Sequence, residues 1–421
     1  MSIFVLRNAN LLDLERGELM DGVDVIVVDG HVAEVGPRLT QPRATDAVYA
    51  LDGLTLMPGL IDCHVHVTAS SVNLGLAARL PNALGVIRSL PILKGMLMRG
   101  FTSVRDAGGG DWALGQAAKD GLIESPRLFT SGKALSQTGG HGDFRARSDQ
   151  IESCACSFRI GNIGRVVDGV DEVRRAAREE LTKGATQIKV MASGGVTSPN
   201  DPIGNTGYSM DELRAIVDEA AAWQTYVMAH AYTPRAIRRA VEAGVRTIEH
   251  GNLVDEATAL LLKDAGVFVV PTLITFDMLS LEGASLGLPP ESIAKVDDVR
   301  LAGREAVAML HRVGVRMGYG SDLLGESHRH QSEELRVRAE IVGNLEALRS
   351  ATTVAAEIVQ HAGKLGVVRP GAIADLLVVR GNPLRDIGVL TGQGERIAAI
   401  MKDGKFVKNE LPVRTSPASV H

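Results

Sequence analysis

The sequence is poor in cysteine and has no long apolar run. Its 421 residues include three cysteines, Cys63, Cys154 and Cys156. An odd and sparse set of this kind does not make a disulfide framework, and it fits a reducing compartment. We interpret Cys154 and Cys156 as two ordinary loop thiols rather than as a metal site or a strained bridge. No apolar stretch approaches the ~20 residues that cross a bilayer, so we expect no membrane partner.

A basic surface and an export signal are also missing. The formal net charge is −5, whereas a nucleic-acid-binding domain usually carries a basic patch or stripe. We therefore expect no nucleic-acid partner. Residues 1–7 contain no charged region, long apolar stretch or small-residue cleavage site of the kind found in signal peptides. We expect a cytoplasmic protein.

Both ends of the chain are rich in predicted β-strands. A chain of this length forms one large domain or two medium ones. Residues 24–35 alternate apolar and polar side chains around Asp29 and Gly30, which is typical of a hairpin with a two-residue turn. Residues 374–379 form a further strand, and residues 397–407 form a second hairpin around Asp403 and Gly404. The simplest assembly is one small β-domain built from both termini.

The middle of the chain separates helices from strands with glycine. At several places a glycine ends a helical pattern and opens a short, almost continuously apolar run. Glycine suits the left-handed cap at a helix C-terminus, and continuous apolar runs suit strands that are covered on both faces. These glycines are Gly100, Gly184, Gly244, Gly266 and Gly314. Helix starts are marked by a capping box at Ser209 and Glu212 and by Thr233 before Pro234.

Alternating helices and buried strands predict an α/β protein with a parallel sheet. Strands are expected to begin near Leu60, Phe101, Arg127, Thr186, Tyr226, Arg246, Val267 and Arg316. Eight strands fit a (β/α)₈ TIM barrel, whereas a doubly wound sheet usually has a Gly-rich nucleotide loop after an early strand. We therefore expect a composite β-sandwich domain of residues 1–58 and 365–413, a barrel of residues 59–364 and a tail of residues 414–421.

The C-terminal ends of barrel strands carry active sites, and several of the predicted strands here carry histidine, lysine or aspartate at or near their ends. The first strand ends in His64 and His66, whose spacing of two places both imidazoles on one face. The other members of the set are Lys189 within an apolar strand and His230, His250 and Asp322 at the ends of later strands. Each has an ordinary structural explanation when taken alone, but coincidence explains poorly why all of them would meet at one mouth.

Metal chemistry explains the set. Neutral imidazoles bind zinc and similar ions. A buried lysine with a lowered pKa can add carbon dioxide and become a carbamate, so Lys189 can bridge two metal ions. Two ions ~3.5–4 Å apart clamp a hydroxide and polarise the bond under attack. Asp322 would take the proton of that hydroxide and pass it to the leaving group.

The pattern resembles the amidohydrolase superfamily in its binuclear branch, which has a carboxylated lysine. The resemblance extends into both β-rich ends, through residues 57–62 and 371–376. It implies that His64, His66 and Asp322 hold one divalent metal ion and that His230 and His250 hold the other. It also implies that Lys189, as N6-carboxylysine, bridges the two ions. These ligands suit several metals, of which we expect zinc.

Within the superfamily, residues 139–143, 191–202 and 230–232 resemble a prolidase-like, imidazolonepropionase-related group. Members of that group cleave Xaa-Pro dipeptides, N-acyl-amino acids and, in some cases, ochratoxin. The resemblance implies that His141 and Tyr232 contact the substrate and donate hydrogen bonds to developing negative charge. Gly194 and Gly195 would let the backbone approach the substrate. We therefore expect hydrolysis of a dipeptide or N-acyl-amino acid.

Other functions use related machinery. A lactonase or a phosphotriesterase-like hydrolase would employ the same binuclear centre, although the phosphotriesterase group resembles a bare barrel. Deaminases and imidazolonepropionase proper generally bind a single metal ion and do not need Lys189. A non-catalytic assembly protein would typically have lost metal ligands, and all six positions are filled here. The resemblance also implies a homo-oligomer.

Overall fold

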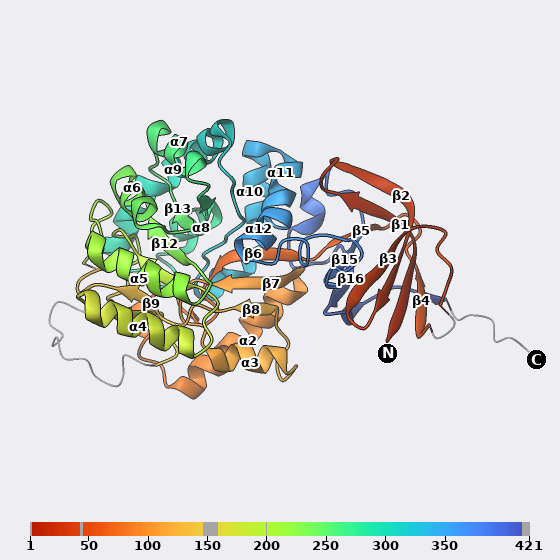
Figure 1. Cartoon of the computed structure of the whole chain (residues 1–421), viewed down its shortest axis with the longest axis horizontal. Helices are drawn as coiled ribbons and strands as arrows, with labels where there is room; N and C mark the ends of the chain where they lie inside the picture. Colours follow the sequence, from red (N-terminus) through yellow and green to blue (C-terminus); the bar gives the residue numbers. More distant parts are fainter. Residues whose placement is uncertain (1, 43–44, 146–158, 199, 415–421) are drawn as a thin grey trace, which may run out of the picture. The chain divides into compact units, whose positions relative to one another are not determined.

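The computed structural model describes residues 2–42, 45–145, 159–198 and 200–414 (Figure 1). The chain divides into two compact units. One consists of Met1–Ile61, Gly95–Ser103 and Leu335–His421, and the other of Asp62–Lys94 and Val104–Glu334. The interpretation of Cys154 and Cys156 and that of residues 415–421 of the tail lie outside the described residues, and the expected domain boundaries stay a prediction. No helix in the described ranges has both the length and the apolar character needed to cross a membrane.

Strands from both termini form one sheet, drawn red and blue in Figure 1. Its strands are β1 (Ile3–Asp13), β2 (Glu18–Val28), β3 (His31–Pro37), β4 (Ala47–Ala50), β5 (Thr55–Pro58), β15 (Leu376–Val379), β16 (Ile397–Lys402), β17 (Lys405–Asn409) and β18 (Val413–Arg414). The order is β17-β16-β15-β5-β1-β2-β3, and β4 pairs with both β1 and β18. The antiparallel pairing of β5 with β15 joins the two ends of the chain. The prediction that the terminal strands form a separate β-structure is confirmed.

Both predicted hairpins are present, and their turns explain their registers. Asp29 and Gly30 link β2 to β3 with φ of 45° and 82°. Asp403 and Gly404 link β16 to β17 with φ of 50° and 72°. Positive φ at both central residues is the mark of the two-residue turn that matches the twist of antiparallel strands. The register of each hairpin thus follows from its Asp-Gly sequence.

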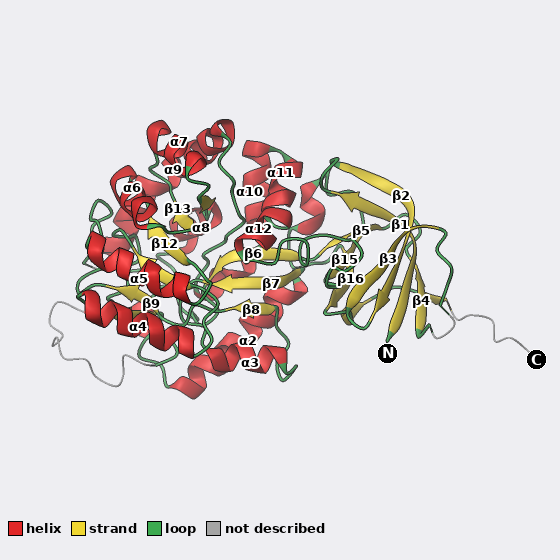
Figure 2. Cartoon of the chain, viewed as in Figure 1, coloured by secondary structure: helices red, strands yellow, loops and turns green. Residues whose placement is uncertain are grey.

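Between the terminal strands the chain alternates strands with helices, mostly within the second unit, and Figure 2 shows helices outside the strands there. The strands here are β6 (Leu60–Val65), β7 (Phe101–Asp106), β8 (Arg127–Phe129), β9 (Ala134–Ser136), β10 (Gly164–Val166), β11 (Ile188–Met191), β12 (Val227–Ala231), β13 (Thr247–His250) and β14 (Phe268–Val270). One sheet has the order β10-β9-β11-β12-β13-β14 with parallel pairing, and another has the order β6-β7-β8. The predicted α/β fold class is therefore confirmed.

The helices begin and end where the sequence signals them. They are α1 (Leu74–Ala77), α2 (Asn82–Met98), α3 (Trp112–Lys119), α4 (Val170–Thr182), α5 (Met210–Ala222), α6 (Pro234–Ala243), α7 (Glu256–Asp264), α8 (Leu273–Glu282), α9 (Pro290–Val313), α10 (Glu333–Val342), α11 (Asn344–Ser350) and α12 (Thr353–Ile358). Short 3₁₀ helices cover Gly325–His330 and Ile387–Leu390. Ser209 and Glu212 form the expected capping box, and Thr233 caps α6. The five glycines expected at helix ends have φ between 65° and 97°.

The last strand expected in the barrel is much shorter than predicted. Near Arg316 the chain makes an isolated parallel bridge between Met317 and Val269 instead of a strand. Beyond it, the Cys63 N–H donates to Tyr319 O at 2.8 Å, so the segment lies beside β6. Gly318 and Gly320 flank this contact, and glycine weakens strand interiors because it costs backbone entropy and has no side chain to pack.

The core of this unit explains the apolar runs in its sequence. Ile188, Val190, Ala229, Ile248 and Val269 are fully buried in one cluster that α4, α5, α6, α7 and α9 help to cover. Strands buried on both faces expose no polar side. Polar residues in such strands are therefore exceptional, and in this protein they gather at the candidate metal centre.

Candidate metal centre

The structure brings all six predicted metal ligands into the lining of one pocket. The pocket is lined by His64, His66, Lys189, His230, His250 and Asp322, and also by His141 and Tyr232. His64, Lys189, His230 and His250 lie on β6, β11, β12 and β13, whereas His66 and Tyr232 directly follow β6 and β12. Asp322 and His141 lie in loops. A concave site with a few converging polar groups is the usual form of a small-molecule site. Gly194 and Gly195 lie in the adjacent loop and do not line the pocket.

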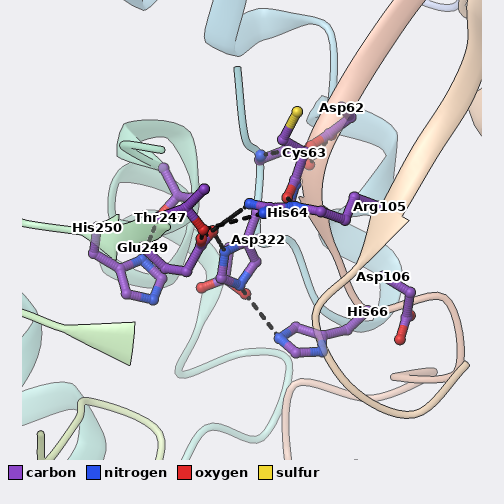
Figure 3. Close-up of polar contacts among 12 residues, drawn as sticks. Asp62, Cys63, His64, His66, Arg105, Asp106, Thr247, Glu249, His250 and Asp322 are labelled. Atoms are coloured by element: carbon purple, nitrogen blue, oxygen red, sulfur yellow. Dashed lines mark hydrogen bonds and ion pairs between the residues drawn. The ribbon is translucent and has the colours of Figure 1, made fainter. Parts of the chain in front are cut away.

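Asp322 lies between the first two histidines (Figure 3). Its Oδ1 is 3.3 Å from Nε2 of His66 and 3.4 Å from Nε2 of His64. Potential ligand atoms of His64, His250 and Asp322 lie within 4.8 Å of one another. The rings of His230 and His250 follow, with centroids 4.7 Å apart. The arrangement places nitrogen and oxygen donors close enough together to share metal ions.

In three of the histidines, Nδ1 is held by a hydrogen bond. Nδ1 of His64 lies 2.7 Å from Glu249 Oε2, and Nδ1 of His66 lies 2.9 Å from Gly108 O. Nδ1 of His250 lies 2.8 Å from Thr272 Oγ1. A ligand histidine typically donates its second N–H in this way, which fixes its tautomer and ring orientation. These rings fit a metal site because Nε2 is left for an ion.

In His230 the other ring nitrogen, Nε2, is held instead. Its Nε2 lies 3.1 Å from Gly194 O, so Nδ1 is the nitrogen left for an ion. Burial lowers the pKa of His230 and of His250 well below the ordinary value, although the charge of Asp322 opposes the shift at His250. Both are therefore neutral imidazoles near neutral pH, which is the form that binds metal ions.

Lys189 is buried in the middle of β11, with 1% of its surface exposed. Burial lowers its pKa to about 8, although the carboxylates of Glu249 and Asp322 oppose this shift. At neutral pH, Lys189 is then a neutral amine in roughly a tenth of the molecules. The neutral amine is the form that can take up carbon dioxide.

Two of the candidate ligands have unusual backbone conformations. His250 has a φ of 74° and Asp322 a φ of 50°. Non-glycine residues adopt positive φ rarely, and such strain is often retained at functional sites. Burial alone would raise the pKa of Asp322, but the charge and hydrogen bond of His64 and the hydrogen bond of His66 hold it well below the ordinary range. Asp322 is therefore a carboxylate able to accept a proton or bind a cation.

A buried ion pair behind His64 was not anticipated from the sequence. Arg105 Nη2 donates to Glu249 Oε1 at 2.9 Å and to Oε2 at 3.0 Å, and both side chains are fully buried. Arg105 also donates to Cys63 O at 2.6 Å and to Thr247 Oγ1 at 3.1 Å. Burial opposes ionisation of Glu249, but Arg105 and His64 outweigh it and lower the Glu249 pKa to about 2. A charged residue inside the apolar run that begins at Phe101 was the available signal.

Two further buried aspartates hold the backbone around the pocket. Asp106 accepts from the N–H groups of Val67, Gly108 and Gly110 at 2.8–2.9 Å. Asp62 accepts from Ser321 Oγ at 2.6 Å and from the His64 N–H at 3.0 Å. These bonds fix the segments on which His64, His66 and Asp322 lie.

His141 and Tyr232 lie over the second pair of histidines. The ring of His141 stacks on that of His230 at 4.2 Å with an interplanar angle of 24°. The ring of Tyr232 lies 4.8 Å from that of His230 and 5.2 Å from that of His250. Burial raises the pKa of Tyr232 well above its ordinary value, so its hydroxyl stays protonated.

The remaining wall of the pocket is mainly apolar, with Thr197 and Thr275 as its polar members. Besides Met191, its apolar side chains belong to Leu74, Phe144, Ile163, Val196, Phe276, Leu279 and Leu324. Most of them belong to one buried hydrophobic cluster that also contains Tyr232. The pocket therefore joins a polar side, rich in imidazole, to an apolar side suited to a hydrophobic group.

Comparisons with known proteins agree with this geometry. Residues 55–407 match the model of the amidohydrolase family. Ochratoxinase of Aspergillus niger is 32% identical over 417 residues, which cover 95% of this chain and 86% of that protein. The crystal structure of a prolidase complexed with N-methylphosphonate-L-proline is 61% identical, with a TM-score of 0.95 over 97% of this chain and 100% of that one. A Xaa-Pro dipeptidase structure with bound methionine is 25% identical, with a TM-score of 0.85 over 97% of this chain and 100% of that one.

Proposed function

The chain belongs to the amidohydrolase family, and on that premise we propose that it cleaves the amide bond of a dipeptide or N-acyl-amino acid at a binuclear metal centre. It is a hydrolase, and its similarity to ochratoxinase and to prolidases supports action on amides.

The orientation of the imidazoles carries the proposal. His64, His66 and His250 each hold Nδ1 in a hydrogen bond, which leaves three Nε2 atoms for ions. We propose that His64, His66 and Asp322 bind one divalent ion and that His230 and His250 bind the other. The buried amine of Lys189, with its pKa near 8, supports its role as the carboxylated bridge. Zinc is the ion we propose, since imidazole and carboxylate ligands suit it.

When bound, two such ions would lower the pKa of a water molecule and polarise the scissile carbonyl. The protein's own groups supply the proton transfers. Asp322 is ionised, because His64 and His66 outweigh the effect of burial on its pKa, and it would accept the proton of the attacking water. The same carboxyl group would then return that proton to the leaving nitrogen, as general acid–base catalysis requires.

Tyr232 and His141 would contact the substrate from the opposite side. The Tyr232 hydroxyl keeps its proton and is hydrogen-bonded to the backbone of Val196. It can therefore donate to an oxygen on which negative charge develops, an interaction that strengthens in the transition state. His141 lines the pocket beside it. The apolar wall, which includes Phe276 and Leu279, would hold a hydrophobic side chain or acyl group and exclude water.

A substrate library tests the proposal. Protein loaded with zinc and bicarbonate would be assayed against Xaa-Pro dipeptides and N-acyl-amino acids, with lactones and phosphotriesters in parallel. We expect steady turnover of amides, and fastest turnover of those with an apolar side chain. Turnover of lactones or phosphotriesters without any amide cleavage would overturn the proposal.

Three broader expectations from the sequence stay predictions. They are a homo-oligomeric state, a cytoplasmic location and the boundaries of the two domains. Light scattering on the purified protein would test the first of them.

A further inference from the structure

A lysine outside the pocket holds the loop that packs against His141. Lys295, on α9, donates to Gly195 O at 3.0 Å, to Ser198 O at 2.7 Å and to Asp201 O at 3.2 Å. An ammonium group has three N–H donors, and all of them are directed at the carbonyls of one loop. Hydrogen bonds with a charged donor are stronger than neutral ones. Lys295 therefore fixes the path of this loop.

The same loop contacts both the plane and the edge of the His141 ring. Gly195 lies against the ring, because a Cβ on Gly195 would come within 2.1 Å of Cε1 and 2.3 Å of Nδ1 of His141. His230 stacks on the ring as well. At the edge of the ring, Ser198 Oγ lies 3.0 Å from Nδ1. The loop thus restricts both the tilt and the rotation of the imidazole.

The hydrogen bonds of Ser198 assign the tautomer of His141. Ser198 Oγ also lies 3.2 Å from Gly195 O, and a carbonyl oxygen can only accept. The hydroxyl of Ser198 therefore donates to Gly195 and accepts from Nδ1–H of His141. In a neutral imidazole the other nitrogen then carries a lone pair. On this assignment, Nε2 of His141 is the nitrogen that can accept a hydrogen bond in the pocket.

The loop also reaches Tyr232. The backbone of Val196 is hydrogen-bonded to the Tyr232 hydroxyl, and the Tyr232 N–H donates to Ser193 Oγ at 3.3 Å. Val196 and Thr197 themselves line the pocket. Both residues expected to contact the substrate are therefore positioned by one loop, and that loop is held by one ammonium group.

We propose that Lys295 is a positioning residue, which aligns His141 and Tyr232 by binding the carbonyls of Gly195, Ser198 and Asp201. The effect of Lys295 on turnover rests on the proposed amide hydrolysis. The effect of Lys295 on the loop and on the His141 tautomer is independent of that proposal. A misplacement of about 1 Å in a positioned group can cost about 100-fold in rate, so the loss of this lysine should be visible in catalysis.

The test compares Lys295→Met with Lys295→Arg in zinc-loaded, bicarbonate-treated protein. Lys295→Met keeps the aliphatic stem and removes the donors, whereas Lys295→Arg retains charged donors. We expect kcat to fall about 10–100-fold in Lys295→Met, with KM changed less than about threefold, and to recover in part in Lys295→Arg. Lys263→Met, at an exposed position in the last turn of α7, is the matched control and should behave as wild type.

A second readout does not depend on activity. In protein labelled with ¹⁵N-histidine, the His141 signals, assigned with His141→Asn, should report a protonated Nδ1 and an unprotonated Nε2. Lys295→Met and Ser198→Ala should both shift these signals, while zinc content stays at the wild-type value. Unchanged His141 signals together with an unchanged kcat in Lys295→Met would overturn the proposal. A wild-type protein that cleaves no amide would refute the proposed function instead, and the ¹⁵N spectra would still decide the role of Lys295.

Discussion

Glu249 accepts a hydrogen bond from His64, with Oε2 2.7 Å from Nδ1, and both side chains are fully buried (Figure 3). The second partner of Glu249 is Arg105, whose guanidinium holds the carboxylate ionised. A carboxylate behind a ligand histidine fixes the ring and raises its basicity. The metal-binding strength of His64 should therefore depend on a residue that never touches the ion.

Replacing Glu249 with glutamine should weaken metal binding. The amide keeps the shape of the side chain but loses the charge that Arg105 and His64 share. We expect the zinc affinity to fall about 10–100-fold. We also expect some loss of stability, since breaking a buried ion pair commonly costs roughly 3–5 kcal/mol. Competition with a chromophoric chelator measures the affinity.

Thr247→Val is the matched control for that experiment. Thr247 donates to Glu249 Oε1 at 2.6 Å and accepts from Arg105, but does not contact His64. The variant disturbs the same buried network, so it should lower stability with little change in zinc affinity. Equal losses of zinc affinity in Glu249→Gln and Thr247→Val would contradict the role given to Glu249.

Gly195→Ala should impair turnover without removing metal. A Cβ at this position would lie 2.1–2.5 Å from three atoms of the His141 ring, so the imidazole must move. We expect kcat/KM to fall about 10–100-fold, while the zinc content measured by mass spectrometry stays at the wild-type value. Gly204→Ala, in the same loop with open space around the position, should be silent. Equal activity of the two variants would argue against a catalytic position for His141.

Much of this site could be predicted from the sequence because its geometry is local. The spacing of His64 and His66 places both on one face of a strand, and Lys189 is exceptional as a charge within the apolar strand β11. The parallel arrangement then brings strand ends together, as it does for His230 and His250. These relationships follow from strand periodicity and from the order of strands.

The supporting contacts could not be predicted, because they join distant segments through side-chain geometry. Arg105 and Glu249 are 144 positions apart, and Lys295 is 100 positions from Gly195. Nothing in the amphipathic pattern of α9 distinguishes Lys295 from a solvated lysine. The shortness of the segment near Arg316 was missed for a different reason, since an apolar run predicts a strand but not the length of its pairing.

Leu279→Ala should change substrate preference. Leu279 is buried in the apolar wall of the pocket, so truncation leaves space beside a hydrophobic substrate group. We expect kcat/KM for substrates with large apolar side chains to fall about 10–200-fold, as is usual when a hydrophobic pocket loses contacts. Substrates with small side chains should be less affected. Leu260→Ala, an exposed leucine on α7, should leave the preference unchanged, and a uniform loss across substrates in Leu279→Ala would contradict this assignment.

Lys133 should make stability depend on pH. Its ammonium group donates to Arg159 O and Asn162 O, and burial lowers its pKa from 10.5 to about 8. Between these values the unfolded chain binds more protons than the folded one, so folding becomes more favourable as the pH rises. The cost of burying the charge is present below pH 8 and disappears toward pH 10.5.

Urea unfolding of wild type and Lys133→Met tests this sign. Because methionine does not titrate, the free-energy difference between the two proteins isolates Lys133. We expect it to move in favour of wild type by about 2 kcal/mol between about pH 7.5 and about pH 9.5. A difference that is constant, or that moves toward the variant, would show that the Lys133 pKa is not lowered on folding.

The most direct test of the central claim is the metal content of wild type and Lys189→Met, each loaded with zinc in the presence of bicarbonate and analysed by mass spectrometry. Methionine keeps the apolar stem in β11 but cannot form a carbamate. We predict two zinc ions per wild-type chain and a clear loss in the variant, together with a mass increase on wild-type Lys189 from the bound carbon dioxide. One zinc ion per chain in both proteins would contradict a bridging lysine and place the enzyme among hydrolases with a single metal ion.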